Sequence, residues 1–195
     1  MIFEPSEYAA RRTRLDSAMQ AQGLDAILMF APDSQYWLTG YDTFGFCFFQ
    51  CLIYANGQSH LLTRSADLRQ AQMTSDITDI RVWTDGRDDP ATVLAAWLGE
   101  LGITGNIGVE TETHGLTAGN GRRLFAQLPN LVEASALVPD LRLVKSDAEI
   151  AYVRRAAALC DDAYEAALPL ITPGADEGAI LAAMQGAVFA GGGDY

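Results

Sequence analysis

Five consecutive residues, Glu110-Thr111-Glu112-Thr113-His114, form the densest group of side chains that could bind a metal ion. Alternate residues of a β-strand share one face, so Glu110, Glu112 and His114 would converge on one ion if a strand continued through them. The threonines and the following glycine indicate that the strand ends here, and a loop does not keep this alternation. We therefore favour a polar strand end in which Glu110 accepts hydrogen bonds from backbone amides.

The other histidine, His60, lies in a segment that we expect to be a strand. No Asp, Ser or Cys lies at a sequence spacing from it that is typical of catalytic groups, so a structural or surface role is favoured over catalysis. The sequence holds no G-x-S-x-G nucleophile motif and no P-loop. Gly119-Asn120-Gly121 lacks the third glycine and the preceding strand of a dinucleotide-binding fingerprint, and Gly191-Gly192-Gly193 is interpreted as a turn.

The loop Tyr41-Asp42-Thr43-Phe44-Gly45 offers side chains suited to recognition. An exposed Tyr and an exposed Phe on a tight loop can anchor in a partner's pocket. We expect Tyr41, Asp42 and Phe44 to lie at such a surface, and the alternative is that Phe44 packs on its own sheet. Arg64 is a weaker candidate for binding a substrate carboxylate, with an ordinary surface arginine as the favoured alternative.

Apolar periodicity and turn residues predict the elements that would position these residues. Asn56-Gly57 is the clearest hairpin turn, with residues 46–54 and 59–63 as its two strands. The cap residues Ser6, Asp33 and Asp89 start three of the predicted helices. The whole pattern is a mixed α/β domain with helices at residues 6–22, 33–39, 65–73, 90–101 and 117–128, and with further strands at residues 26–30, 80–83, 106–110 and 131–134.

The pattern changes at Ser146, which forms a capping box with Glu149 at the start of a long amphipathic helix. Pro173-Gly174 turns the chain, and Asp176 caps a second helix. Two helices with no sheet to cover make a poor stand-alone domain. We therefore predict an α/β domain at residues 1–144, followed at residues 145–195 by part of a second domain. The apolar stripe expected on the first helix consists of Ile150, Val153, Ala157, Cys160, Tyr164 and Leu168.

Composition narrows the class of protein. The 195 residues carry a net charge of -12, and no run of Lys or Arg offers a phosphate-binding face, so we expect neither a nucleic acid nor an anionic membrane as partner. The three cysteines have no regular spacing, and Cys47 and Cys51 are expected to be small buried hydrophobic residues. With no secretory signal and no membrane-spanning run, a cytoplasmic protein is the expectation.

Several stretches together resemble one family. Leu-Arg-Leu-Val-Lys-Ser at residues 141–146, followed by Glu149-Ile150, resembles the domain junction of the creatinase, prolidase and aminopeptidase P family. The stretches at residues 24–28, 36–40 and 107–110 are similar to that family as well, so the resemblance covers nearly the whole chain. The chain departs from the family pattern at two positions near the second cap: Asp176 replaces a hydroxyl residue, and Ala179 replaces an acidic one.

The resemblance implies a three-layer N-terminal domain followed by the first helices of a truncated "pita-bread" catalytic domain. It implies a parent hydrolase that cuts an amide-type bond in small substrates, most often peptides with Pro in the second position. Two divalent ions (Mn, Co or Zn) would be bound in the parent by residues absent from this chain, which we expect to be inactive alone. A homodimer is implied, in which Tyr41, Asp42, Phe44 and Arg64 shape access to the partner's active site.

Two alternatives stay open. The parent could act on an amidine or a cyclic compound, as creatinase and ectoine hydrolase do, because substrate choice in this family depends mostly on the catalytic half. The chain could also be a stand-alone, non-catalytic binding or dimerisation module, with the apolar stripe after Ser146 as its interface.

Overall fold

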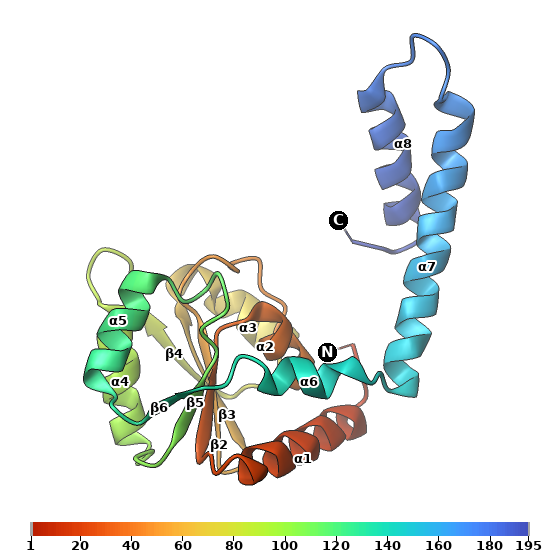
Figure 1. Ribbon diagram of the computed structural model, residues 1–195. Helices are drawn as coiled ribbons and strands as arrows, with labels where there is room; N and C mark the ends of the chain where they lie inside the picture. Colours follow the sequence, from red (N-terminus) through yellow and green to blue (C-terminus); the bar gives the residue numbers. More distant parts are fainter. Residues whose placement is uncertain (1, 195) are drawn as a thin grey trace. The chain divides into compact units, whose positions relative to one another are not determined.

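The computed structural model describes residues 2–194. The chain divides into two compact units, with the boundary between Leu143 and Val144. The first unit is a mixed α/β domain and the second is a pair of helices (Figure 1). Among the described helices, none combines the length and the apolar character that crossing a membrane requires.

The first unit is built on a six-stranded sheet in the order β4-β3-β2-β1-β5-β6. Strand β2 pairs antiparallel with both β1 and β3, while the β1–β5, β5–β6 and β3–β4 pairs are parallel. All strands except β2 therefore point the same way, which confirms the predicted mixed sheet. The strands are β1 (Ala26–Met29), β2 (Cys51–Ala55), β3 (Gln58–Arg64), β4 (Asp79–Trp83), β5 (Ile107–Val109) and β6 (Leu131–Glu133).

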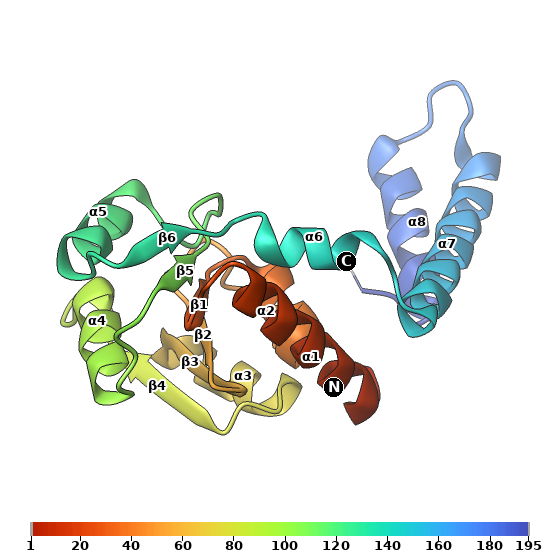
Figure 2. The same ribbon diagram turned by 60° about the horizontal axis from the view of Figure 1, so that its bottom comes forward.

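Helices cover both faces of this sheet, giving three layers (Figure 2). One face packs against α4 (Pro90–Glu100) and α5 (Ala118–Gln127), through Leu94, Trp97 and Leu124. The helices of the other face are α1 (Pro5–Ala21), α2 (Pro32–Thr39), α3 (Leu68–Thr74), which follows the short 3-10 turn η1 (Ser65–Asp67), and α6 (Leu137–Leu143). The sequence did not predict α6, because its seven residues include Pro139 and are too few to establish a helical period.

Strand β1 shows how the core is shared between the faces. Ala26 and Leu28 lie in the cluster under α4 and α5, while Ile27 and Met29 lie in the cluster under α1 and α2. Side chains alternate across a strand, so a strand with helices on both sides needs an unbroken apolar run. That run was the basis for predicting a buried strand here, and the prediction is confirmed.

Two helix starts differ from the prediction, and a third keeps its predicted cap residue without the side-chain cap bond. The caps of α1 and α2 are Glu4 and Ala31 rather than Ser6 and Asp33, because Pro5 and Pro32 occupy the first helical position of each, where a missing N–H costs nothing. Asp89 does precede α4, but its carboxylate binds the Thr92 hydroxyl at 2.7 Å and the Arg123 Nε at 3.1 Å instead of a backbone amide.

One charged side chain of helix α1 lies in the interior of the domain. Arg11 is only 2% accessible. Its guanidinium donates to the Trp37 carbonyl at 2.7 Å and to the Glu7 carboxylate at 3.0 Å, and lies 4.3 Å from the centre of the Phe3 ring. These contacts compensate the burial of the charge and attach α1 to α2.

The second unit pairs α7 (Asp147–Ala167) with α8 (Glu177–Ala190), joined by a segment that contains the 3-10 turn η2 (Leu168–Leu170). Ser146 and Glu149 form the predicted capping box, and Asp176 accepts from the Gly178 amide as predicted. The predicted apolar stripe is not the face that packs within the unit, since Ala163 and Ala167 are buried while Tyr164 and Leu168 are exposed.

Candidate functional site

The carboxyl ends of the five parallel strands meet at one edge of the sheet, and the loop that leads into β2 reaches the same edge. Open α/β sheets commonly bind ligands at this edge. The loops that gather there are residues 30–31, 40–50, 84–89 and 110–117, and every candidate residue singled out by sequence except His60 lies on them or directly beside them.

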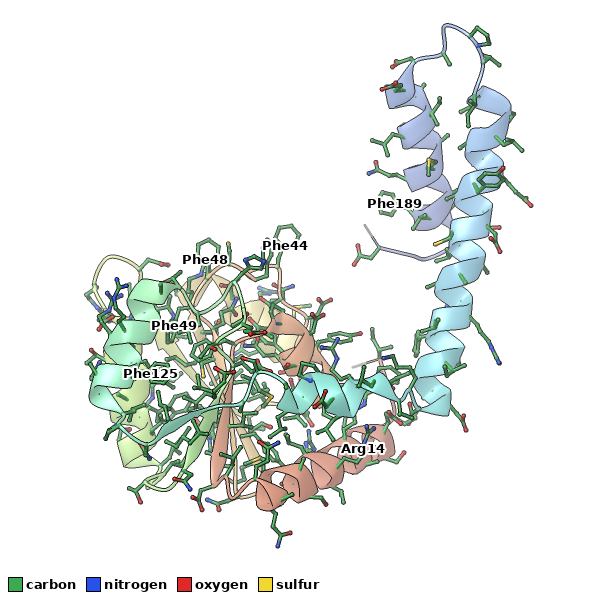
Figure 3. The ribbon with its side chains drawn as sticks, viewed as in Figure 1. Arg14, Phe44, Phe48, Phe49, Phe125 and Phe189 are labelled. Carbon is green, nitrogen blue, oxygen red and sulfur yellow. The ribbon has the colours of Figure 1, made fainter. Side chains whose placement is uncertain are left out.

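The most exposed apolar side chains at this edge come from residues 42–49, which we call the aromatic loop. Phe44, Phe46 and Phe48 are 68%, 55% and 42% accessible. Phe49 points the other way and packs edge-on against Phe30, with ring centroids 5.0 Å apart. Figure 3 shows Phe44 and Phe48 projecting from this end of the sheet. The predicted strand at residues 46–54 is therefore wrong in its first half, because residues 46–50 form a loop before β2.

Gln50 fixes the base of the aromatic loop. Its Oε1 accepts from the hydroxyls of Tyr41 and of Thr63, the latter at 2.8 Å. Its Nε2 donates to the Thr43 hydroxyl at 3.0 Å and to the Gly45 carbonyl at 2.9 Å. The buried carboxamide thereby uses its hydrogen-bonding capacity in full, which a buried polar group requires for stability.

Tyr41 and Cys47 are placed differently from the predictions made for them. Tyr41 is fully buried, so its predicted exposure is wrong: the ring lies in the core under α1 and α2 and the hydroxyl bonds to Gln50. Burial raises the pKa of the Tyr41 phenol. Cys47 was expected to be buried but is exposed on the aromatic loop, whereas Cys51 is buried as predicted.

Asp42 and Phe44 are exposed, so this structure leaves both accessible to a partner. The Asp42 amide donates to the Thr74 hydroxyl at 3.1 Å, which ties the start of the aromatic loop to the end of α3. The alternative that Phe44 packs on its own sheet is wrong, because 68% of the residue is accessible.

Arg64 supports the aromatic loop from below. Its guanidinium carbon lies 3.3 Å from the centre of the Phe48 ring, and its Nε donates to the Asp67 carboxylate at 2.9 Å. A second carboxylate, on Asp85, lies 3.9 Å from the guanidinium. Gly45 packs so closely that an added Cβ would lie 3.3 Å from both Asp67 carboxylate oxygens. Arg64 is thus neutralised by Asp67 and covered by Phe48.

Glu110 does not adopt the metal-binding arrangement that was the less favoured interpretation of residues 110–114. Its carboxylate is turned inward, where it accepts from the amides of Phe30 at 2.9 Å and Ala31 at 2.8 Å and from the Ser34 hydroxyl at 2.5 Å. Burial raises the pKa of Glu110, and these hydrogen bonds oppose that rise. The favoured interpretation of Glu110 as an acceptor for backbone amides is confirmed.

The two other members of that cluster point elsewhere. Glu112 and His114 are exposed, and the His114 ring lies edge-on to Phe46 with centroids 6.3 Å apart. Residues 2–194 contain no group of three His, Cys, Asp or Glu side chains placed to hold a metal ion. The residues present therefore do not fit a metal centre.

His60 lies at the start of β3, away from the aromatic loop. Its Nδ1 is 2.6 Å from the Asp79 carboxylate, the neighbouring residue across the β3–β4 pair, and its ring packs against Trp97 with centroids 5.9 Å apart. The favoured structural role is consistent with this burial. The sequence could not reveal Asp79 as its partner, because only strand pairing brings the two together.

A known family matches nearly the same residues as the α/β domain. The family model for the creatinase/prolidase N-terminal domain matches residues 11–144. The chain belongs to this family. The predicted family and fold class are thereby confirmed.

The similarity to individual proteins extends beyond residues 11–144. An uncharacterised hydrolase/peptidase of Sinorhizobium fredii is 29% identical over 99% of the chain and 52% of its own length. Ectoine hydrolase of Halomonas elongata is 26% identical over 99% of the chain and 54% of its own length. The chain thus spans about half the length of the curated relatives that it matches. Both of these relatives are named as hydrolases.

A solved structure shows the same fold. The Xaa-Pro dipeptidase of Bacillus anthracis superposes with a TM-score of 0.74 and 24% identity, covering 94% of this chain and 49% of the dipeptidase.

Sequence reasoning singled out Phe44 but missed Phe46, Phe48 and Gln50. The first two lie in the predicted strand at residues 46–54, and a lone Gln carries no sequence signal of a hydrogen-bond network.

Proposed function

We propose that this chain is the N-terminal part of a hydrolase of the Xaa-Pro peptidase type, which cleaves an amide bond in a small peptide. Membership of the creatinase/prolidase N-terminal domain family supports this proposal, as does the hydrolase/peptidase that is 29% identical. The helix pair after Ser146 is then the start of the catalytic domain, and its exposed apolar side chains are covered by the rest of that domain.

The exposed aromatic loop is the part of this chain to which we assign a function. In a homodimer, Phe44 and Asp42 would lie at the substrate entrance of the partner subunit, while Tyr41 and Arg64 position the loop from beneath. The supporting observation is that Phe44 is 68% accessible although the base of its loop is fully hydrogen-bonded. A rigid, exposed aromatic side chain is suited to closing over a bound substrate.

We place the catalytic centre in the part of the whole protein that lies outside this chain. Two divalent ions (Mn, Co or Zn) would activate water for attack on the scissile carbonyl in the whole protein. The described residues of this chain offer no such site, so we assign none of them to metal binding and expect the 195-residue chain to be inactive alone.

The proposal is tested with the complete product of the gene and a set of Xaa-Pro dipeptides, with and without added Mn²⁺. We expect metal-dependent cleavage, and we expect Phe44→Ala to lower kcat/KM by roughly tenfold, equivalent to about 1.4 kcal/mol of transition-state stabilisation. Val132→Ala, which trims an exposed apolar residue on the edge strand β6, is the matched control and should change nothing. Equal activity of the Phe44 variant and the wild type would refute the role of the loop.

A second candidate function has a specific observation in its favour. Ectoine hydrolase matches 99% of the chain at 26% identity, close to the value for the hydrolase/peptidase. The parent could then open a cyclic amidine instead of cutting a peptide. Incubating the whole protein with ectoine and with Xaa-Pro dipeptides in parallel distinguishes the two, because each candidate predicts turnover of one substrate class only.

A further inference from the structure

A cavity of about 330 Å³ lies between α5 and the loop that follows β5, on the first unit alone. Its walls are mostly apolar, and Phe125, which Figure 3 labels on α5, is 43% accessible on one side of it. A volume of this size suits a small ligand. The lining residues are Thr111, Leu116, Thr117, Ala118, Gly121, Arg122 and Phe125.

Gly121 keeps this cavity open without being required by the fold. A Cβ added there would have only the Leu116 side chain near it, at 3.9 Å, which is an ordinary contact. Its backbone is helical, so no special conformation demands glycine. Glycine disfavours a helix relative to alanine. Local stability would therefore favour a side chain at this position, and any larger side chain would project into the space that the cavity now occupies.

Arg122 gives the cavity a charge. Among the described residues, no carboxylate or hydrogen-bond acceptor pairs with its guanidinium, whereas the neighbouring Arg123 is paired with Asp89 at 3.1 Å. Thr111, on the same wall, donates its hydroxyl hydrogen to Glu133, and Arg122 is the one cationic side chain among the residues that line the cavity.

We propose that this cavity binds a small amphipathic carboxylate, such as an N-acylated apolar amino acid. The apolar group would lie against Leu116 and Phe125, and the carboxylate would pair with the Arg122 guanidinium. The Arg122 guanidinium selects a carboxylate over a neutral analogue, and the Glu133 carboxylate bound to Thr111 reduces the size of that preference. This site is separate from the aromatic loop and does not depend on the proposed hydrolase activity.

The test is a titration of the ¹⁵N-labelled 195-residue chain with N-acetyl-leucine, followed by amide chemical shifts at neutral pH. We expect saturable shifts centred on Gly121 and Phe125, with dissociation in the millimolar range. N-acetyl-leucinamide, which has the same apolar group but no charge, should bind about three- to fivefold more weakly, as expected for a solvent-exposed ion pair. No saturable shift, or equal binding of the acid and the amide, would overturn the proposal.

Three variants separate the apolar and the charged parts. Gly121→Leu fills the cavity and should weaken binding by at least about tenfold, as loss of one apolar side-chain site implies. Gly119→Leu is the matched control, since it lies in the same helix turn but outside the cavity, and it should bind as the wild type does. Arg122→Gln should make the acid and the amide bind alike. Unchanged binding by Gly121→Leu, or an unchanged preference for the acid in Arg122→Gln, would contradict the site.

Discussion

Replacement of Glu110 by Gln and by Ala would separate the two things this buried carboxylate does. It accepts three hydrogen bonds, from the Phe30 and Ala31 amides and from the Ser34 hydroxyl, and it places a charge in the interior. A glutamine can keep all three contacts, with its oxygen accepting from both amides and its nitrogen donating to the Ser34 oxygen. Alanine keeps none of them.

The expected magnitudes differ accordingly. Each buried donor left without an acceptor costs about 1–3 kcal/mol, so Glu110→Ala should lose roughly 3–5 kcal/mol from a domain whose total stability is of order 5–15 kcal/mol. For a domain of this size that corresponds to a fall in Tm of roughly 10–15 °C. Glu110→Gln should lie within about 1 kcal/mol of the wild type at pH 7, because it removes a desolvated charge and keeps the contacts.

Tryptophan fluorescence during urea or thermal unfolding is the assay. Trp37, Trp83 and Trp97 all lie in the first unit, so the signal reports the α/β domain and not the helix pair. If Glu110→Gln lost as much stability as Glu110→Ala, the charge itself would be required, and the argument that Glu110 serves as a neutralisable acceptor would be refuted.

The pH dependence gives an independent check. Burial raises the pKa of Glu110 in the folded protein above its ordinary value of 4.5, so protonation favours the folded state. The wild type should therefore gain stability relative to Glu110→Gln as pH falls through the folded pKa, until it reaches the ordinary value. The gain is lost as pH rises again. A wild type that instead loses stability relative to Glu110→Gln over this window would show that the pKa is lowered.

Three further substitutions test other parts of the structure. Gln50→Leu should cost about 2–4 kcal/mol in urea unfolding, because four buried polar groups lose their partner, and should speed amide exchange at Gly45. Asn56→Val should cost about 1–2 kcal/mol by the same measurement, since Asn56 has a φ of 52°, and Asn56→Gly should not. Ser146→Ala should cost about 1 kcal/mol of helix stability, seen as faster amide exchange in the first turn of α7.

Each of these three predictions has a result that would contradict it. If Gln50→Leu lowers the free energy of unfolding by less than about 0.5 kcal/mol, the size of an ordinary surface effect, the Gln50 network does not stabilise the domain as predicted. Asn56→Val with wild-type stability would mean that the turn adopts another conformation. Unchanged exchange in Ser146→Ala would mean that the capping box contributes nothing in solution.

Local sequence signals predicted the elements where short-range physics decides the outcome. Asn56-Gly57 forms the turn because both residues have positive φ, and Ser146 caps α7 because its partner Glu149 lies three residues away. The apolar run at residues 26–30 became a buried strand because its neighbours on both faces are helices. In each case the deciding contact lies within a few residues or follows from alternation alone.

Long-range partners explain what the sequence could not predict. Arg11 carries no local sequence signal of burial, because the Trp37 carbonyl that accepts from it is 26 residues away. Tyr41 looked like an exposed anchor, and its burial depends on Gln50, which itself carries no motif. The side of α7 that packs is set by α8, so small residues such as Ala163 were buried in place of the larger Tyr164.

Contacts at the base of the aromatic loop keep its Phe44 side chain exposed. A loose loop would lay its phenylalanines on the nearest apolar surface, because exposed apolar area costs about 25 cal/mol per Å². Here Phe49 is inserted into the core, Phe48 lies over Arg64, and Gln50 holds the loop base, so Phe44 stays exposed. Loosening the base with Gln50→Leu should therefore reduce stability and kcat/KM together in the whole protein. Phe44→Ala should reduce kcat/KM alone, and that difference distinguishes the side chain that contacts the substrate from the residues that hold it in place.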